Sequence, residues 1–150
     1  MLHILAVLKH KVYVCYFLAI FSAKLFWRAL FHDLSKFSRI ERTGFSKASQ
    51  KMHKVAYGSE EYEHLRKTEE MKLASAHHHR VNRHHPEHFH DFHALGGVTG
   101  MTLVDLVEMW CDWQSAVKRQ EGGSLHRSVQ VNKEGFGISD QLAQILRNSI

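Results

Sequence analysis

The chain has 150 residues, 44% of them hydrophobic and 23% charged, which excludes a disordered tail and favours one domain over two. Lysine and arginine number 20 against 15 aspartates and glutamates, and the net charge of +5 is compatible with an anionic small molecule, a nucleic acid or a membrane surface. Histidine is the outlier, with 14 copies, eight of them between His77 and His93.

The N-terminal segment is apolar and predicts two helices, over residues 2–22 and 24–32. The apolar run from Val12 to Ala23 is shorter than the ~20 residues that a membrane-spanning helix needs, and basic residues stand on both sides of it. A secretory signal would also require a small-residue cleavage site, which does not follow here. We therefore expect a buried core helix and no stable membrane insertion.

The two cysteines, Cys15 and Cys111, lie in apolar surroundings and form no CxxC pair. This pattern indicates buried thiols in a reducing compartment, and we expect a cytoplasmic protein. The oligomeric state cannot be predicted from these features.

The rest of the chain also has helical patterns and lacks a convincing period-two strand pattern. The sequence therefore predicts an all-α fold, a compact helical bundle that forms a single domain over residues 1–150. The expected elements are a helix over 46–57, a stop at Gly58, a helix over 59–76 with Ser59 as N-cap, a polar, histidine-dense segment over 77–93, a helix from Thr102 to Gln120, a loop over 125–137 with a short extended stretch at Ser128–Val131, and a last helix from the cap Ser139 through Arg147.

The strongest local motif is the string HDLSKF, which begins with His32 and Asp33. An imidazole nitrogen and a carboxylate oxygen at a helix end suit a cation such as Fe, Mn, Co or Zn. Lys36 follows one turn after His32, where its ammonium group can stand beside a metal-bound anion. The alternative is a helix C-terminus in which His32 belongs to the core and Asp33 caps the next turn.

A histidine-dense segment, HHHRVNRHH, follows at residues 77–85. Consecutive histidines point in different directions, so only a few of them can enter one site. His78 and either His84 or His85 are separated by a loop and can approach a common point, with Asn82 as a partner that orients one of them. The alternatives are a solvated polar loop and a loose metal-scavenging tract.

A third motif lies on the predicted helix 102–120, where acidic residues form one stripe on an otherwise apolar helix. The stripe consists of Asp105, Glu108 and Asp112. A largely buried helix needs partners or a metal for such carboxylates, whereas an exposed stripe would need neither. Helical spacing alone does not separate Asp105 from Asp112 as a ligand.

Taken together, the order His10, His32-Asp33, later histidines and a helical aspartate resembles the HD-domain superfamily of metal-dependent phosphohydrolases, which is all-α. More specifically, the chain is similar to a family of small, functionally uncharacterised bacterial and phage proteins. The motifs that carry this similarity cover nearly the whole chain: KHKVYV, HDLSKF, HHRVNRHH, EMWCDW and NKEGFGISDQL.

The resemblance implies a ligand set and a chemistry. The primary metal ligands would be His10, His32, Asp33 and Asp112. A second ion would add His78 and His84, with His85 as the rival of His84. One or two divalent ions (Fe, Mn, Co, Ni or Zn) would activate a water for attack on a phosphate ester. Asp33 would bridge two ions or hold that water, Lys36, Arg80 and Arg83 would bind the phosphate, and Glu108 would orient a ligand or act as general base.

The predicted function is thus hydrolysis of a nucleotide or another small phosphate ester. Two alternatives stay open. An HD-fold di-iron oxygenase would use the same set of ligands, and a non-catalytic, metal-stabilised helical protein would bind a partner. The lysines and arginines are scattered along the sequence, which argues against a nucleic acid as partner.

Overall fold

The computed structural model describes residues 2–52, 55, 59–120 and 122–150. Within these ranges every regular element is helical, which confirms the predicted all-α class. The chain divides into two units, a first that ends at His32 and a second over Asp33–Ile150, here called the helical body. A single helix has no core of its own, so this division leaves the single domain over 1–150 a prediction.

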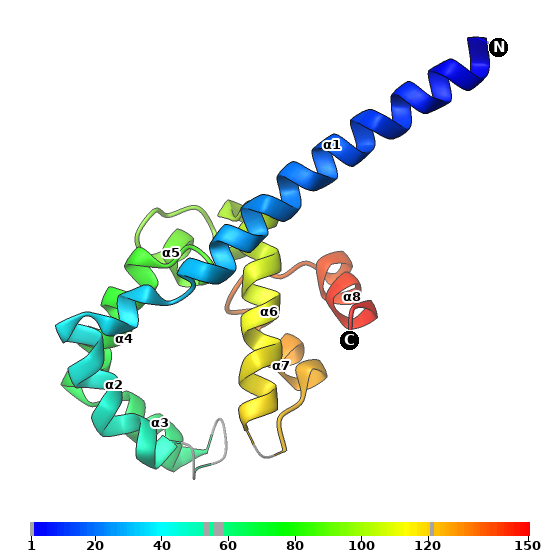
Figure 1. The fold of residues 1–150 in the computed structure, drawn as a ribbon. Coiled ribbons are helices and arrows are strands. Elements are labelled where there is room, and N and C mark those ends of the chain that lie inside the picture. The colour runs from blue at the N-terminus through cyan, green and yellow to red at the C-terminus, as the bar shows by residue number, and fades with distance from the viewer. Residues whose placement is uncertain (1, 53–54, 56–58, 121) are drawn as a thin grey trace. The chain divides into compact units, whose positions relative to one another are not determined.

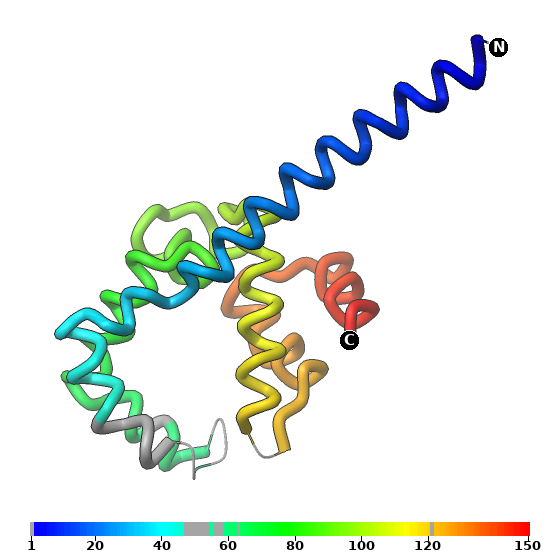
Figure 2. The backbone as a smooth tube through the Cα atoms, in the orientation of Figure 1, coloured from blue at the N-terminus to red at the C-terminus, as the bar shows by residue number. Residues whose placement is uncertain are grey.

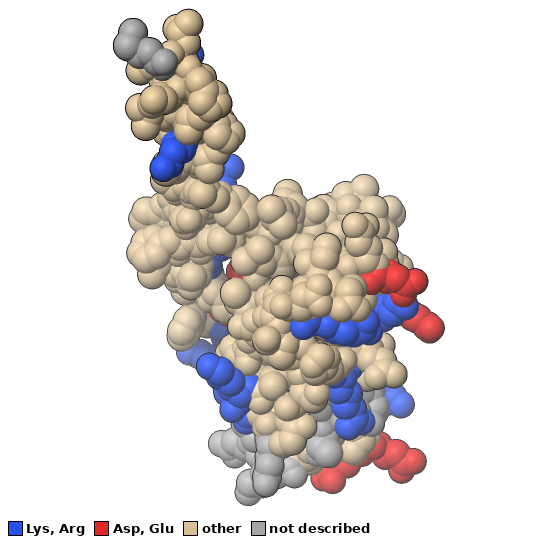
Figure 3. Space-filling model, turned by 90° about the vertical axis from the view of Figure 1, so that its right-hand side faces the viewer, with Lys and Arg blue, Asp and Glu red and all other residues tan. Residues whose placement is uncertain are grey.

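The first unit is one continuous helix, α1 (Leu2–Phe31), and not the two that the sequence predicts. No proline or glycine occurs between Leu2 and Phe31, so nothing interrupts the helical hydrogen bonds. None of its residues is buried, and the expectation of a buried core helix is therefore wrong. In length and composition the segment Leu2–Phe37 could span a membrane, a criterion that core helices and signal sequences also meet. Its surface in Figure 3 is mostly neutral with a few basic side chains.

The helical body begins with a 3₁₀ helix, η1 (Leu34–Phe37), followed by α2 (Arg39–Met52), which lies alongside α4 (Glu69–Val81) (Figure 2). The close approach depends on Gly44, because a Cβ there would stand 2.5 Å from Ala74 Cβ and from the carbonyl oxygen of Glu70. The predicted helix 46–57 corresponds to α2, which starts earlier, at Arg39. Some of the last residues of the predicted helix lie outside the described residues.

The predicted helix 59–76 is two helices, α3 (Glu60–Arg66) and α4. Ser59 caps α3 as expected, since its side chain accepts a hydrogen bond from the backbone N–H of Tyr62. The break comes at Thr68, whose extended backbone starts α4. The predicted stop at Gly58 lies outside the described residues.

The histidine-dense segment forms two helical parts joined by a turn, and not a loop. Its first residues, through Val81, extend α4, and α5 (Pro86–Asp91) starts with a proline at a position where no backbone N–H is needed. His88 Nδ1 lies 2.9 Å from the carbonyl oxygen of Arg80, and this hydrogen bond ties α5 to the end of α4. The turn between them therefore holds His84 and His85 in place.

The remaining helices pack around α6 (Leu103–Arg119), which begins with a capping box between Thr102 and Asp105 as the predicted helix start requires. A second 3₁₀ helix, η2 (Gly97–Gly100), precedes it. The apolar core that α6 shares with the elements after it consists of Trp110, Val129, Ile138, Ala143 and Leu146.

Two helices complete the body, α7 (Leu125–Asn132) and α8 (Asp140–Asn148). Ser139 caps α8, as predicted. The expected loop with an extended stretch at Ser128–Val131 is wrong, because Ser124 caps a helix whose Val129 is fully buried in the apolar core. The expectation of buried thiols is also wrong. Cys111 lies on the exposed face of α6, and Cys15 lies on α1, where no residue is buried.

Candidate metal centre

Asp33 stands at the start of η1 in a left-handed backbone conformation, with φ 58°. Aspartate tolerates this region better than most residues, and the sharp turn it makes ends the preceding helix. One of its oxygens, Oδ2, accepts a hydrogen bond from the ammonium group of Lys36. The other, Oδ1, lies 3.3 Å from His78 Nε2 and 3.5 Å from His84 Nε2. Asp33 thus joins two histidines from different segments.

His78 is oriented by a buried carboxylate that sequence analysis did not identify. Glu41, from α2, is fully buried and places its oxygens 2.8 Å from His78 Nδ1 and 2.7 Å from His77 Nδ1. An ionised carboxylate only accepts hydrogen bonds, so Nδ1 of His78 carries the proton and Nε2 presents its lone pair. Asn82, predicted as an orienting partner, also contacts this ring, at 3.1 Å from Nδ1.

His84 repeats the arrangement with a different carboxylate. Its Nδ1 lies 3.3 Å from Oε1 of Glu108, which is buried on α6, while its Nε2 faces Asp33. Glu108 was predicted to orient a ligand or to act as general base, and this contact supports the orienting role. Glu108, the middle residue of the acidic stripe on α6, therefore contacts His84 directly.

His85 completes the group. Its Nε2 lies 2.9 Å from His78 Nε2, and its Nδ1 faces Glu87 Oε2 at 4.0 Å. Each of three imidazoles thus turns Nδ1 to a carboxylate and Nε2 toward a common point. We call Asp33, His78, His84 and His85 the histidine cluster, whose four ligand atoms all lie within 4.8 Å of one another. Carboxylates that hold the far nitrogen of a ligating histidine are typical of metal sites.

The distances fit a bound ion. Two ligands at 2.0–2.2 Å from one ion lie about 2.9–3.5 Å apart at tetrahedral or octahedral angles. Three separations in the cluster, His78 to His85 at 2.9 Å and Asp33 to His78 and His84 at 3.3 and 3.5 Å, fall in this range. The two contacts to Asp33 Oδ1 are longer than most N–H···O hydrogen bonds. Three imidazoles and one carboxylate suit a divalent transition metal such as Zn or Fe.

The surroundings of His78 and His85 lower their pKa values and so favour the neutral imidazoles that metal binding requires. Burial lowers the pKa of His78, and nearby Asp33 and Glu41 offset this only in part. Burial, followed by the charges of His84 and His78, lowers the pKa of His85 well below its ordinary value. Burial alone would raise the pKa of Glu41, but its hydrogen bonds with His77, Ser35 and His78 outweigh it and the pKa is lowered.

A cavity of about 660 Å³ opens beside the cluster, with His78, His79 and His85 in its wall. Its lining residues come from η1, α2, α3, α4, α5 and α6 and from the turn before α5. Figure 1 labels these α-helices in the helical body. Four cationic side chains line it: Lys36, Arg42, Arg66 and Arg119. An anion bound in this cavity would therefore meet both the cluster and several positive charges.

Two of the remaining predicted ligands belong to the first unit. Within α1, His10 stands 21 residues before Phe31, so the helical rise separates them by about 30 Å. His10 therefore cannot share an ion with His32 of the same chain, and its assignment is wrong. His32 ends the first unit and stays a predicted ligand because it directly precedes Asp33 in sequence.

On α6 the structure distinguishes the two rival aspartates. A ligand atom of Asp112 lies within 4.8 Å of one of His84, and Asp112 also lines the large cavity. Asp105 instead binds Arg83 through two hydrogen bonds of 3.1 and 3.3 Å and caps α6. Arg83, predicted to bind phosphate, thus has a structural partner.

Two further predictions concern Arg80 and the choice between His84 and His85. Arg80 is exposed on α4 and is not among the described residues that line the large cavity. Both His84 and His85 enter the cluster, so neither excludes the other.

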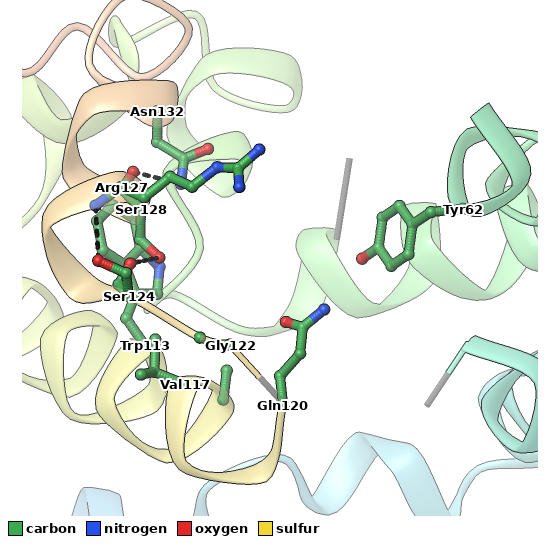
Figure 4. A pocket seen from close by; sticks show the side chains of 11 residues that line it. Tyr62, Trp113, Val117, Gln120, Gly122, Ser124, Arg127, Ser128 and Asn132 are labelled. Carbon is green, nitrogen blue, oxygen red and sulfur yellow. Dashed lines mark hydrogen bonds between the residues drawn. The ribbon is translucent and has the colours of Figure 1, made fainter. Parts of the chain in front are cut away.

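A second cavity, of about 260 Å³, lies at α6 and α7 (Figure 4). Tyr62 faces Trp113 and Arg127 across it. Two of its α7 side chains donate hydrogen bonds to nearby backbone carbonyl oxygens, Ser128 to Ser124 and Asn132 to Ser128. Among the described residues of its wall there is no histidine and no carboxylate, so this cavity lacks the chemistry of the first.

Comparisons with known proteins place the chain in a family without assigning it an activity. No curated protein and no solved structure matches it. A family model does match, over residues 2–150, and its description is "Family of unknown function (DUF5662)". That match spans nearly the whole sequence, as the shared motifs led us to expect. The chain belongs to the DUF5662 family.

Proposed function

We propose that this protein is a metal-dependent phosphohydrolase that acts on a small phosphate ester. The observation that carries the proposal is the convergence of three imidazole Nε2 atoms and Asp33 Oδ1 beside a cationic cavity. Clustered histidines and carboxylates that could hold a metal are what the structure shows, and the activity is our inference from them.

The histidine cluster would hold the ion, with His32 and Asp112 as further predicted ligands. A divalent transition metal bound there supplies Lewis acidity and a water of lowered pKa. Glu41 and Glu108 would keep the imidazoles of His78 and His84 turned with Nε2 toward the ion, because each lies against an Nδ1, at 2.8 and 3.3 Å.

Lys36 would bind the phosphoryl group. Its ammonium contacts Asp33, its side chain is 45% exposed, and it lines the cavity. A phosphoryl oxygen can therefore reach it without displacing any buried group. Arg42 lines the same cavity one residue after Glu41 in α2, which places a second positive charge near the cluster. Both side chains would stabilise the negative charge that builds up on the phosphoryl oxygens.

The test uses metal-stripped protein reconstituted separately with Mn, Co, Ni, Zn and Fe, assayed on a panel of phosphate esters. We expect hydrolysis with at least one metal and none without. Lys36→Met should keep its metal and lose about ten- to a hundredfold in kcat/KM, the cost of one charge-assisted contact. Lys118→Gln, an exposed cation of α6 outside the cavity wall, is the matched control.

Two results would overturn the proposal. Uptake of two irons with oxygen consumption would favour the di-iron oxygenase. Stable metal binding with no hydrolysis on the whole panel would favour a metal-stabilised, non-catalytic protein.

A further inference from the structure

The large cavity has two chemically different ends. Its two lining carboxylates belong to the end at the histidine cluster, since Glu87 faces His85 and Asp112 lies near His84. Its other end is formed by the last residues of α3 and α6, which contribute Arg66 and Arg119. Among the described lining residues, that far end is purely cationic.

Helix geometry gives the distance between the two ends. Along α6, Arg119 comes 11 residues after Glu108, the residue that contacts His84, and the helical rise makes this about 16 Å. Asp112, which also lies near His84, comes seven residues before Arg119, and the helical rise makes this interval about 10 Å. In α4, His78 stands nine residues after Glu69, the first residue of that helix, and Arg66 comes three residues before Glu69. Both helices thus separate the far arginines from the cluster.

The far end of the cavity carries positive charge that a phosphoryl group at the cluster does not meet. At the cluster, Asp33, Glu41 and Glu108 add carboxylates to the two in the wall and offset part of the charge of the ion and Lys36. A phosphate monoester carries roughly −1.5 to −2 near neutral pH. The ion and Lys36 would bind this group, and Arg66 and Arg119 lie too far away to touch it.

We infer that the substrate is an elongated small molecule with a second anionic group, phosphate or carboxylate, about 10 Å from the phosphoryl group that reacts. This inference rests on the proposed function, because the near end is defined by the ion. The cavity volume of about 660 Å³ suits such a molecule, since pockets for small ligands measure roughly 300–1,000 Å³.

The experiment uses non-hydrolysable ligands as rulers. An alkyl phosphonate and a series of α,ω-alkane bisphosphonates with increasing spacer length are titrated calorimetrically into the zinc-loaded protein. We expect the monophosphonate and the short bisphosphonates to bind with similar affinity. Affinity should then rise about ten- to a hundredfold once the spacer lets the second group reach the far arginines.

Arg119→Gln and Arg66→Gln should each reduce that gain about tenfold or more and leave monophosphonate binding unchanged. Both side chains are exposed, so folding is preserved, and the melting temperature of each variant verifies it. Lys118→Gln, next to Arg119 but outside the wall, should keep the full gain.

The inference is overturned if affinity does not depend on spacer length, or if both arginine variants keep the gain. The proposed function fails separately. Length-dependent binding without hydrolysis of any ester rejects the hydrolase, whereas hydrolysis with length-independent binding rejects only the second anionic group.

Discussion

The histidine cluster and the apolar core use the same helix in opposite ways. One face of α6 contributes Glu108 to the cluster, while Trp110, two residues on, packs against Val129 and Leu146 of the core. The core is stabilised by burial of apolar surface, which needs no partner of defined geometry. The region around the cluster instead buries Glu41, His78 and His84, each of which costs free energy unless a partner satisfies it.

This difference indicates where function resides. A chain selected only for stability would fill both regions with apolar side chains. Buried polar groups rarely stabilise a fold more than well-packed apolar side chains of similar volume. A set of buried groups whose lone pairs converge is useful when an ion binds to it. The core then serves as the rigid support that fixes α6, and with it Glu108.

The largest expected effect comes from Glu41→Leu, which removes the acceptor of two imidazoles at similar side-chain volume. We expect a loss of about 3–5 kcal/mol in the free energy of unfolding, because buried partners are left unsatisfied. Zinc affinity should also fall about 10- to 100-fold, since His78 loses its orientation. Chemical denaturation and zinc titration measure the two effects.

The matched control is Glu69→Leu, which replaces an exposed glutamate of α4 that pairs with the exposed Lys72. It should change neither quantity. Equal zinc affinity in the Glu41 variant and the parent protein would contradict the orienting role.

In the apolar core, Leu146→Ala should cost about 3 kcal/mol, because it leaves a cavity at a side chain that is 4% exposed. Zinc affinity of the folded variant should not change. Ile145→Ala, next to it but 53% exposed, should be nearly neutral. A large loss of zinc affinity in Leu146→Ala would show that the two regions are not separable.

Gly44→Ala tests the contact between α2 and α4 that supports Glu41. A Cβ at this position meets Ala74 and the Glu70 carbonyl oxygen at 2.5 Å, so we expect a loss of about 2 kcal/mol from forced separation of the helices. Thermal denaturation measures it. Gly135→Ala, where a Cβ has nothing within 4 Å, should be tolerated. If both substitutions behave alike, close packing at Gly44 is unimportant.

The smallest effect concerns pH and the pair formed by Asp105 and Arg83. Burial would raise the pKa of Asp105, but hydrogen bonds from Arg83 and Thr102 outweigh it and the pKa lies below the ordinary 3.8. A lowered pKa means that the ionised form stabilises the fold above pH 3.8 and that this contribution disappears as the pH falls through the folded value.

We therefore expect Asp105→Asn to be about 1 kcal/mol less stable than the parent protein at neutral pH. The difference should shrink on acidification below the ordinary pKa. Denaturation series at several pH values provide the measurement, and a difference that grows toward acid would contradict the sign.

Local signals in the sequence identified much of the site. Asp33 was found because it belongs to a compact motif, and His78, His84 and His85 were found because a turn must lie between them. Helix starts with a capping side chain, such as Ser139, were likewise predictable. Such features depend on residues that are near one another in the chain.

Features that depend on distant residues were missed. Glu41 meets His78 across 37 positions, and nothing near it in the sequence marks it as buried. The helix α7 contains Val129 and Val131, which favour extended structure, and only burial of Val129 in the apolar core overrides that preference. The assignment of His10 failed for a related reason, since it assumed a chain reversal that the continuous helix α1 does not make.

The central claim is that the histidine cluster holds one transition-metal ion. X-ray absorption spectroscopy of the zinc-reconstituted protein, together with its metal content, tests this most directly. We predict one zinc per chain in a first shell with imidazole scattering and ligands at about 2.0–2.2 Å, and loss of that shell in the double variant His78→Gln, His84→Gln. A zinc shell without imidazole, or one that this double variant leaves unchanged, would contradict the account.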